Sequence, residues 1–555
     1  MGDRWWEDAV IYQVYLRSFA DGNGDGYGDI PGLRSRLGYL RSLGVDAVWV
    51  SPWYPSPMRD GGYDVADYQD IDPLFGSLED AAALFEDAHR IGLRVLIDVV
   101  PNHTSDQHPW FLAALSSAEG APARERYYFR DGRGPDGSLP PNDWPSAFGG
   151  PAWSRTTRPD GSPGQWYLHL FAPEQPDLNW GCGEVQHDFE KVMRFWYDLG
   201  ADGCRVDAVP AMGKDSTLPD AGIAASDVFS PSGWPETPLW DGESVHGVLR
   251  SWRAVAASYS PEKFLVGEVI VNGPARLARY LRDDELHSVL GFELSRAPWS
   301  AEAFRACIGP TLDGPWPGRA RPTWFLSSHD EVRAVTRYAQ AQAQARDRRP
   351  GGTGQAQLAA GTARARAALL VMLALPGAAC IYQGEELGLW QVEDLPLELL
   401  EDPIVARTGD PSKGRDGCRV PVPWAGGAPP FAFTPGPSSW LPQPRSWADL
   451  TVDHQQRSAG STLRLVTRAL ELRRETAGLL TDRFEWREPG DGALAFERGA
   501  GFSCVANFDG GPLDLPPGTD VVLASGPLAG DGRLPAGTAA WLTVSVPLRG
   551  RRPGS

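Results

Sequence analysis

Three acidic residues stand near the ends of short apolar, β-branched runs. They are Asp207, Glu268 and Asp330. One acid at the end of a strand can be a cap or a salt-bridge partner. Three acids at the same end of neighbouring strands would repel one another, so this arrangement favours a functional role over a structural one.

Two of these carboxyl groups could cleave a glycosidic bond. One ionised carboxylate must attack the anomeric carbon, and one protonated carboxyl group must protonate the leaving oxygen. Arg205 lies two residues before Asp207, on the same strand face, and its charge favours ionised Asp207. We therefore predict Asp207 as nucleophile and Glu268 as acid/base, about 5–5.5 Å apart in a retaining enzyme. Asp330 remains to hydrogen-bond sugar hydroxyls and to stabilise the transition state.

Strand-like and helical segments alternate along most of the chain, which is typical of βα units and a parallel sheet. The predicted strands cover 9–19, 46–52, 94–103, 203–209, 264–269, 287–294, 322–330 and 378–386. Eight such strands close a (β/α)₈ TIM barrel, in which active sites lie at the C-terminal strand ends. The fold class is therefore α/β, with the three acids at the catalytic end.

Two segments depart from this alternation. Residues 104–175 are rich in Gly, Pro and polar residues and are too long for a structureless loop, so we predict a small inserted domain B after strand three. Residues 482–555 show short strands and Gly-rich turns, which predict a C-terminal antiparallel β domain, a β-sandwich. The catalytic barrel is then expected to comprise 1–103 and 176–481, closed by a helix at 461–480.

The composition limits the partners. A formal net charge of -19 repels nucleic acids and anionic membranes, so neither is expected as a partner. The 22 Trp residues suit sugar binding, although core packing is their more frequent use. Six cysteines without metal-ligand spacing are typical of free thiols in a reducing compartment. We find no signal-peptide pattern and no apolar run of about 20 residues, and expect a cytoplasmic protein.

Several segments resemble the signatures of the α-amylase superfamily. They are DVVPNH (98–103), GCRVDAV (203–209), GEV (267–269) and SSHD (327–330), together with GYDVADY, FGGPAW, YQGEELG and GRDGCRVP. QPDLNW (175–180) resembles a fifth signature, found in the oligo-1,6-glucosidase and α-glucosidase branch. The resemblance covers about residues 5–545. It implies the same barrel and the same roles for Asp207, Glu268 and Asp330.

The resemblance also implies which residues hold a glucosyl ring. Tyr63 would be the stacking platform, and Arg205 would line the same subsite. His103 and His329 would hydrogen-bond the sugar hydroxyls. These residues would make a site for one glucose unit.

Other family positions would close that site. Asp64, paired with Arg415 or Arg419, would cover the non-reducing end, as in exo-acting glucosidases. Phe148 and Phe171 would wall the pocket from the inserted domain.

The segment DGNGDGYGD (21–29) resembles the first nine positions of an EF-hand loop, although a Gly/Asp turn is the alternative. The oxygen donors would be Asp21, Asn23, Asp25, the carbonyl of Tyr27 and Asp29. Position 12 of the loop lacks the usual Glu, because Gly32 stands there. Related glucosidases hold a structural Ca²⁺ or Mg²⁺ at this loop, so the resemblance implies such an ion. No organic cofactor is expected.

The residue after the nucleophile bears on the substrate. In this branch Val accompanies α-1,6 activity and Ala or Thr α-1,4 activity, so Ala208 favours short α-1,4 glucosides such as maltose. We expect an exo-acting α-glucosidase, monomeric or homodimeric, that acts on a disaccharide or small oligosaccharide. A glucosyl transferase or isomerase similar to trehalose synthase is the alternative. A non-catalytic transporter-associated relative is a further one, disfavoured by the three acids. Loops 210–240 and 338–360 would shape the aglycone side.

Overall fold

The computed structural model describes residues 4–223, 237–318, 320–340, 354–476, 481–499 and 501–544. Eight parallel strands close into a barrel in the spatial order β1-β11-β10-β9-β8-β7-β3-β2. They are β1 (Val10–Val14), β2 (Ala47–Val50), β3 (Arg94–Val99), β7 (Gly203–Val206), β8 (Phe264–Gly267), β9 (Ser288–Gly291), β10 (Thr323–Phe325) and β11 (Ala379–Tyr382). Each lies within a predicted segment, so the predicted barrel is confirmed. Asp98 and Arg205 lie within β3 and β7, whereas Asp207, Glu268 and Asp330 follow their strands and belong to the loops above the barrel.

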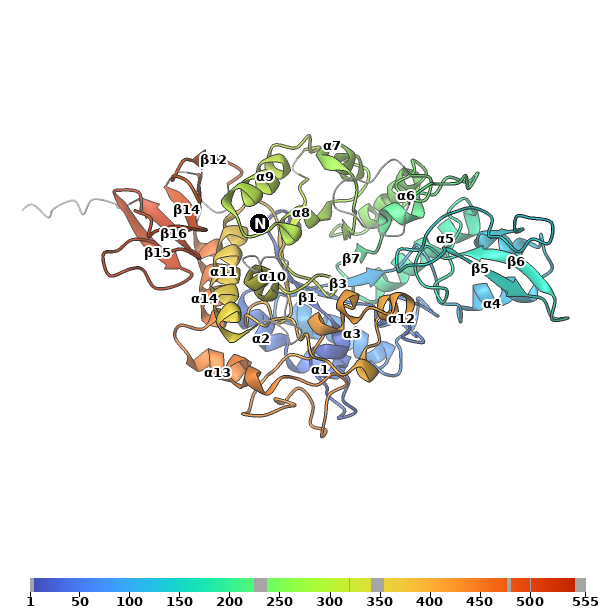
Figure 1. Cartoon of the computed structure of the whole chain (residues 1–555), viewed down its shortest axis with the longest axis horizontal. Coiled ribbons are helices and arrows are strands. Elements are labelled where there is room, and N and C mark those ends of the chain that lie inside the picture. The colour runs from blue at the N-terminus through green and yellow to red at the C-terminus, as the bar shows by residue number, and fades with distance from the viewer. Residues whose placement is uncertain are drawn as a thin grey trace, which may run out of the picture.

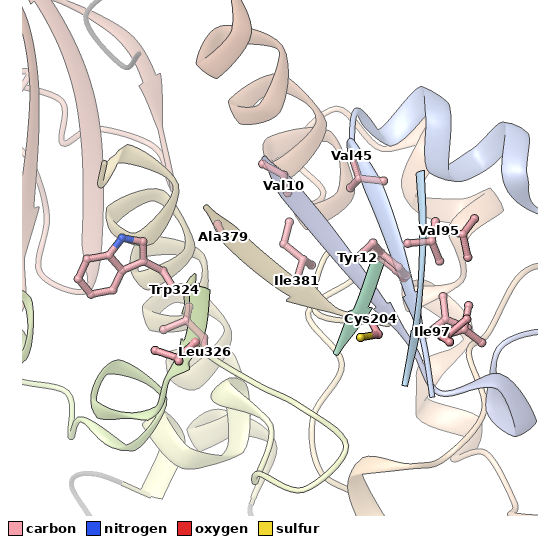
Figure 2. Packing of buried hydrophobic residues seen from close by; sticks show 14 of the residues in the cluster. Val10, Tyr12, Val45, Val95, Ile97, Cys204, Trp324, Leu326, Ala379 and Ile381 are labelled. Atoms are coloured by element: carbon pink, nitrogen blue, oxygen red, sulfur yellow. The ribbon is translucent and has the colours of Figure 1, made fainter. Parts of the chain in front are cut away.

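Strand side chains alternate between two cores. Val10 and Tyr12 of β1 point outward and join Val95, Ile97 and other residues in the layer between strands and helices (Figure 2). Inward-pointing side chains fill the barrel itself, as the packed interior of this fold requires. This inner cluster includes Ile11, Trp49, Leu96, Phe264, Phe325 and Cys380.

Helices surround the barrel (Figure 1). They are α1 (Ile30–Ser35), α2 (Leu37–Leu43), α3 (Leu78–Arg90), α5 (Gly183–Leu199), α6 (Val245–Ala257), α7 (Gly273–Leu277), α8 (Phe292–Arg296), α9 (Ala301–Leu312), α10 (Ala334–Gln340), α11 (Gln355–Ala374), α12 (Pro403–Thr408), α13 (Val452–Arg457) and α14 (Thr462–Glu475). The capping box at Ser77 and Asp80 begins α3. The predicted closing helix is α14, which contacts α2 and α11; residues 477–480 lie outside the described residues.

The segment after β3 forms its own small sheet at one end of the molecule (Figure 1). It contains α4 (Pro109–Ser116) and the strands β4 (Phe129–Arg130), β5 (Trp153–Thr157) and β6 (Pro163–Leu168), in the order β4-β6-β5. Phe148 and Phe171 share an apolar cluster with Ala208, which follows β7. This cluster fixes the insert beside the C-terminal end of the barrel.

A five-stranded antiparallel sheet lies at the other end (Figure 1). Its strands are β12 (Phe484–Arg487), β13 (Ala493–Arg498), β14 (Phe502–Asn507), β15 (Thr519–Ala524) and β16 (Thr538–Val544), in the order β12-β13-β14-β16-β15. The predicted antiparallel domain is confirmed, but the predicted sandwich is wrong for the described residues, where loop leucines such as Leu513 and Leu534 cover the second face. Residues 545–555 lie outside the described residues.

The helices in the described ranges were also compared with what a bilayer crossing requires. None of them is both long enough and apolar enough to span a membrane.

Candidate active site

One buried guanidinium gathers three carboxyl groups at the barrel mouth. Arg205 of β7 is the register partner of Asp98 of β3, and its Nη1 donates to Asp98 at 2.9 Å. The same Nη1 donates to Asp207 at 2.6 Å, and Nη2 donates to Glu268. Asp207 and Glu268 therefore converge on adjacent nitrogens of one side chain. Sequence reasoning left Asp98 without a role, although it is the one acid in an otherwise apolar strand core.

A strained turn places the Asp207 and Glu268 carboxyl groups side by side. Ala208 has φ 41° and ψ 44°, in the left-handed region that residues with a side chain seldom adopt. The chain turns there at the end of β7, and the Ala208 N–H donates to Oε2 of Glu268 at 3.2 Å. Because Glu268 directly follows the neighbouring strand β8, this bond links the two strand ends.

Two acids of the Arg205 cluster have raised pKa values. Burial raises the pKa of Asp207 well above its ordinary value, and although Arg205 opposes this, Glu268 and Asp98 add to the rise. Burial raises the pKa of Asp98 to about 6 despite Arg205. We had expected Arg205 to keep Asp207 ionised. The difference arises because one positive charge is divided among three acids, so Arg205 offsets the burial of Asp207 only in part.

A second cluster lies on the loop after β11. The guanidinium of Arg415 donates to Asp60 at 2.7 Å, to Asp330 at 2.9 Å and to Asp402 at 2.7 Å. Arg419 donates to Asp330 at 3.0 Å. Burial alone would raise the pKa of Asp402, but Arg415 lowers it to about 2. Against burial, His329, Arg415 and Arg419 likewise hold the pKa of Asp330 far below its ordinary value.

The predicted pairing of Asp64 with Arg415 or Arg419 is wrong. The Asp64 carboxylate is fully buried and accepts two backbone N–H groups and one hydroxyl from residues 56–60. Burial raises the pKa of Asp64 to about 7. Asp60 contacts Arg415 instead.

Two glycines explain why Asp60 takes this position. Gly61 and Gly62 have φ 59° and 103°, and they turn the chain between Asp60 and Asp64. The acid before the turn faces Arg415, and the acid after it closes the turn. The Gly pair was visible in the sequence, but it does not say which acid faces the pocket.

Tyr63 and two histidines lie between the clusters. The rings of Tyr63 and His329 stack with centroids 5.1 Å apart, and the Tyr63 hydroxyl donates to Asp98 at 2.9 Å. Burial lowers the pKa of His103 to about 4 and that of His329 well below its ordinary value, so both imidazoles are neutral near pH 7. A neutral imidazole can donate from one ring nitrogen and accept at the other, which suits sugar hydroxyls.

The insert supplies an aromatic wall. The ring of Phe148 lies 5.2 Å from the guanidinium carbon of Arg415 and 5.4 Å from the ring of Phe171. Phe171 in turn lies 5.1 Å from the ring of His103. Successive contacts from Arg415 through the two phenylalanine rings to His103 therefore join the barrel loops to the insert.

One cavity touches both clusters. Its lining includes Trp49, Arg205, Glu268, His329 and Asp330. Charged groups and aromatic rings thus surround the same space. Residues 224–236 and 341–353, parts of the loops predicted to shape the aglycone side, lie outside the described residues.

The loop 21–29 is folded around its own acids. Asp21 accepts backbone N–H groups two, three and five residues further on, at 2.6–2.9 Å. Asn23 and Asp25 each accept the N–H two residues on, the ring of Tyr27 stacks on Trp440, and Asp29 caps α1. Across the described ranges, no three His, Cys, Asp or Glu side chains are arranged to hold a metal ion. The Ca²⁺ or Mg²⁺ site stays a prediction.

Comparisons with known proteins agree with this geometry. The alpha amylase catalytic domain model matches residues 13–482. A probable alpha-glucosidase of Rhizobium meliloti (strain 1021) is 37% identical over 90% of this chain and 87% of its own. An oligo-1,6-glucosidase of Heyndrickxia coagulans is 33% identical over 81% of each chain.

Solved structures are similar over nearly the whole length. The alpha-glucosyl transfer enzyme XgtA has a TM-score of 0.83 and 36% identity, covering 97% of this chain and 99% of that one. The trehalulose synthase MutB from Pseudomonas mesoacidophila MX-45 has a TM-score of 0.83 and 29% identity, covering 98% of this chain and 100% of that one. The chain belongs to the alpha-amylase family and is a glycoside hydrolase.

Proposed function

We propose that the protein is an exo-acting, retaining α-glucosidase that removes the non-reducing-end glucose from short α-glucosides. The observation that carries this proposal is the convergence of Asp207 and Glu268 on Arg205. The Asp60–Arg415 ion pair lies beside the same cavity, because Arg415 also donates to Asp330 of the cavity lining. Two carboxyl groups at one anomeric centre are what double displacement requires. An ion pair beside the cavity supports a site for one glucosyl unit rather than for an internal chain segment.

Opposite protonation of the two carboxyl groups gives the reaction its order. When a glucosyl ring occupies the site, Asp207 attacks the anomeric carbon while Glu268 gives its proton to the glycosidic oxygen, and the bond to the leaving sugar breaks. A β-glucosyl ester of Asp207 results. Glu268, now ionised, takes a proton from water, which attacks the anomeric carbon of the ester; the bond from that carbon to the Asp207 oxygen breaks, and α-glucose and free Asp207 are released.

The remaining pocket groups hold the sugar. His103 and His329, both neutral, exchange hydrogen bonds with hydroxyls, and Asp330 stabilises the positive charge that develops at the anomeric centre. Asp60 and Arg415 bind the hydroxyls farthest from the scissile bond. The small side chain of Ala208 leaves room for a 4-linked leaving sugar, and we propose maltose as a good substrate.

Transfer to a second sugar is the other candidate outcome. XgtA is named an alpha-glucosyl transfer enzyme and MutB a trehalulose synthase, and both share this fold over almost their whole length. In transfer a sugar hydroxyl replaces water in the second step, and the same two carboxyl groups serve.

A product time course on maltose, isomaltose, sucrose and trehalose tests the proposal. We expect glucose as the main product, released fastest from maltose, with small amounts of transfer products at high maltose concentration. Trehalose or another isomer as main product, with little glucose, would replace the hydrolase assignment by the transferase one. No turnover of any α-glucoside would overturn both.

We also propose that the loop 21–29 binds Ca²⁺ or Mg²⁺, supported by its oxygen-bearing side chains at alternate positions. Such an ion would stiffen the loop and take no part in catalysis. Elemental analysis should find about one equivalent, lost in Asp21→Ala together with several degrees of thermal stability. An unchanged melting temperature in excess chelator would contradict the proposal. We further propose that the protein is cytoplasmic and that it is a monomer or a homodimer. Light scattering would distinguish the monomer from the homodimer.

A further inference from the structure

The segment of residues 402–415, here called the strap, leaves the barrel after β11 and reaches the insert. It contains α12 and ends at Arg415 of the second cluster. Asp402 joins its two ends, because its carboxylate caps α12 at the N–H of Ile404 (2.9 Å) and accepts from the backbone N–H of Arg415 at 2.6 Å. The position of α12 and that of Arg415 are therefore mechanically linked.

Hydrogen bonds from Arg407 connect the strap to the insert, and these bonds are here called the clasp. Its Nε donates to the carbonyl of Gly149 at 2.8 Å, and its Nη2 contacts that carbonyl and donates to the carbonyl of Pro151 at 3.3 Å. The side chain is half-buried. A planar guanidinium suits two carbonyl groups on one loop better than an ammonium does.

Glycines make this close approach possible. Gly149 and Gly150 have φ 96° and 74°, where only glycine is unstrained. A Cβ on Gly149 would lie 3.3 Å from Thr408, and a Cβ on Gly150 would lie 3.1 Å from Arg407. The FGGPAW segment is thus shaped to receive α12.

Apolar packing completes the contact. Ile404 packs against the cluster that contains Phe148 and Phe171, and Phe148 also faces Arg415. Gly149, the residue that Arg407 holds, directly follows Phe148. The clasp between Arg407 and the insert therefore fixes both the aromatic wall and the arginine that faces Asp60.

We infer that Arg407 is a positioning residue that gives the enzyme its exo specificity: it clasps the strap to the insert and closes the far end of the glucosyl pocket. An oligosaccharide then enters only with its non-reducing end first. This inference rests on the proposed function. Without the clasp, the strap and the Phe148 loop separate, and the pocket opens into a cleft that accepts an internal chain segment.

Three variants test the inference. Arg407→Ala removes the clasp, and Arg407→Lys keeps the charge but can hold only one carbonyl. Arg158→Ala is the matched control, because Arg158 lies on the same insert and pairs with Glu119 at 2.6 Å on an exposed face. Circular dichroism and thermal unfolding first verify that each variant is folded.

The substrates are nitrophenyl α-glucoside and a nitrophenyl maltoheptaoside whose non-reducing end is blocked at O4 and O6. Wild type and Arg158→Ala should leave the blocked substrate intact. Arg407→Ala should cleave it internally, and its KM for the glucoside should rise about tenfold, the equivalent of one lost charged hydrogen bond, with kcat much less affected. Arg407→Lys should lie between wild type and Arg407→Ala in both respects.

The possible outcomes distinguish a failure of the inferred role of Arg407 from a failure of the proposed α-glucosidase function. Folded Arg407→Ala with wild-type KM and no cleavage of the blocked substrate would overturn the clasp, as would wild type that already cleaves it. If Arg407→Ala does not fold, Arg407→Lys decides: a raised KM supports the clasp, and an unchanged KM overturns it. Wild type inactive on every α-glucoside refutes the proposed function, whatever the variants do.

Discussion

The pocket contains two arginine clusters that treat their carboxyl groups in opposite ways. Around Arg205, one guanidinium faces Asp98, Asp207 and Glu268, and burial raises the pKa of Asp98 to about 6 and that of Asp207 well above its ordinary value. Around Arg415, a second guanidinium assists, and the pKa of Asp402 falls to about 2. The ratio of positive to negative groups contributes to the difference, because one guanidinium faces three acids around Arg205 and two guanidinium groups face three acids around Arg415.

The different pKa values of the carboxyl groups in the two clusters suit two different tasks. One task is catalysis, and in the Arg205 cluster a single guanidinium faces three acids, so the burial of Asp98 and Asp207 is offset only in part and their pKa values stay raised. Groups that must stay charged to bind hydroxyls or to hold a loop need full compensation, which Arg415 and Arg419 provide. Asp60 is intermediate, since burial raises its pKa despite both arginines.

The largest effect should come from Asp207→Asn in the first cluster. The amide cannot attack the anomeric carbon, so kcat on maltose should fall by about 10⁴-fold or more while the fold is kept. Steady-state kinetics with purified variant measure it. A loss of less than about tenfold would remove Asp207 from the nucleophile role.

Glu268→Gln should have the next largest effect, and it should depend on the leaving group. The variant cannot protonate the glycosidic oxygen, so kcat on maltose should fall by about 10²–10⁴-fold. The first step with α-glucosyl fluoride, whose leaving group needs no proton, should lose far less. Equal losses on both substrates would contradict the assignment of Glu268 as the acid.

The second cluster should respond through KM. Asp60→Asn should raise KM for maltose about tenfold to a hundredfold, because a charged hydrogen bond to the sugar is lost. Asp64→Asn is its matched control, and should leave KM unchanged while lowering the free energy of unfolding by about 1–3 kcal/mol through an unpaired backbone N–H. The reverse result would restore Asp64 as the pocket residue.

The smallest effect concerns pH. Asp98 helps to raise the pKa of Asp207, which must be ionised to attack. In Asp98→Asn this contribution disappears, so the pKa of Asp207 falls and the acid limb of kcat/KM moves to lower pH. A pH profile of kcat/KM for both proteins tests this, and an acid limb that stays in place or moves upward would contradict the cluster's electrostatics.

The barrel was predictable because its strands are short and apolar and alternate with helical patterns, and several of them carry a polar residue at or just after the same end. The convergence of Asp207 and Glu268 follows from that rule, since both end adjacent parallel strands. The resemblance supplied further pocket positions, such as His103 and Phe148.

Residues outside regular elements were harder to predict. Asp60 and Asp64 flank the same glycine pair, and only the φ angles of Gly61 and Gly62 decide which one reaches Arg415. The protonation of Asp207 depends on how many acids share Arg205, which requires the position of Asp98. Arg407 lies on the short helix α12, outside the barrel elements, and donates to a carbonyl group 258 residues away, which no local pattern reveals.

The most direct test of the central claim is to trap the covalent intermediate. A 5-fluoro-α-glucosyl fluoride forms the glucosyl ester quickly and hydrolyses it slowly, and mass spectrometry of the digested protein locates the adduct. We predict one fluoroglucosyl group on the peptide that contains Asp207, and none in Asp207→Asn. Rapid turnover without any adduct, or an adduct on another carboxyl group, would contradict the account.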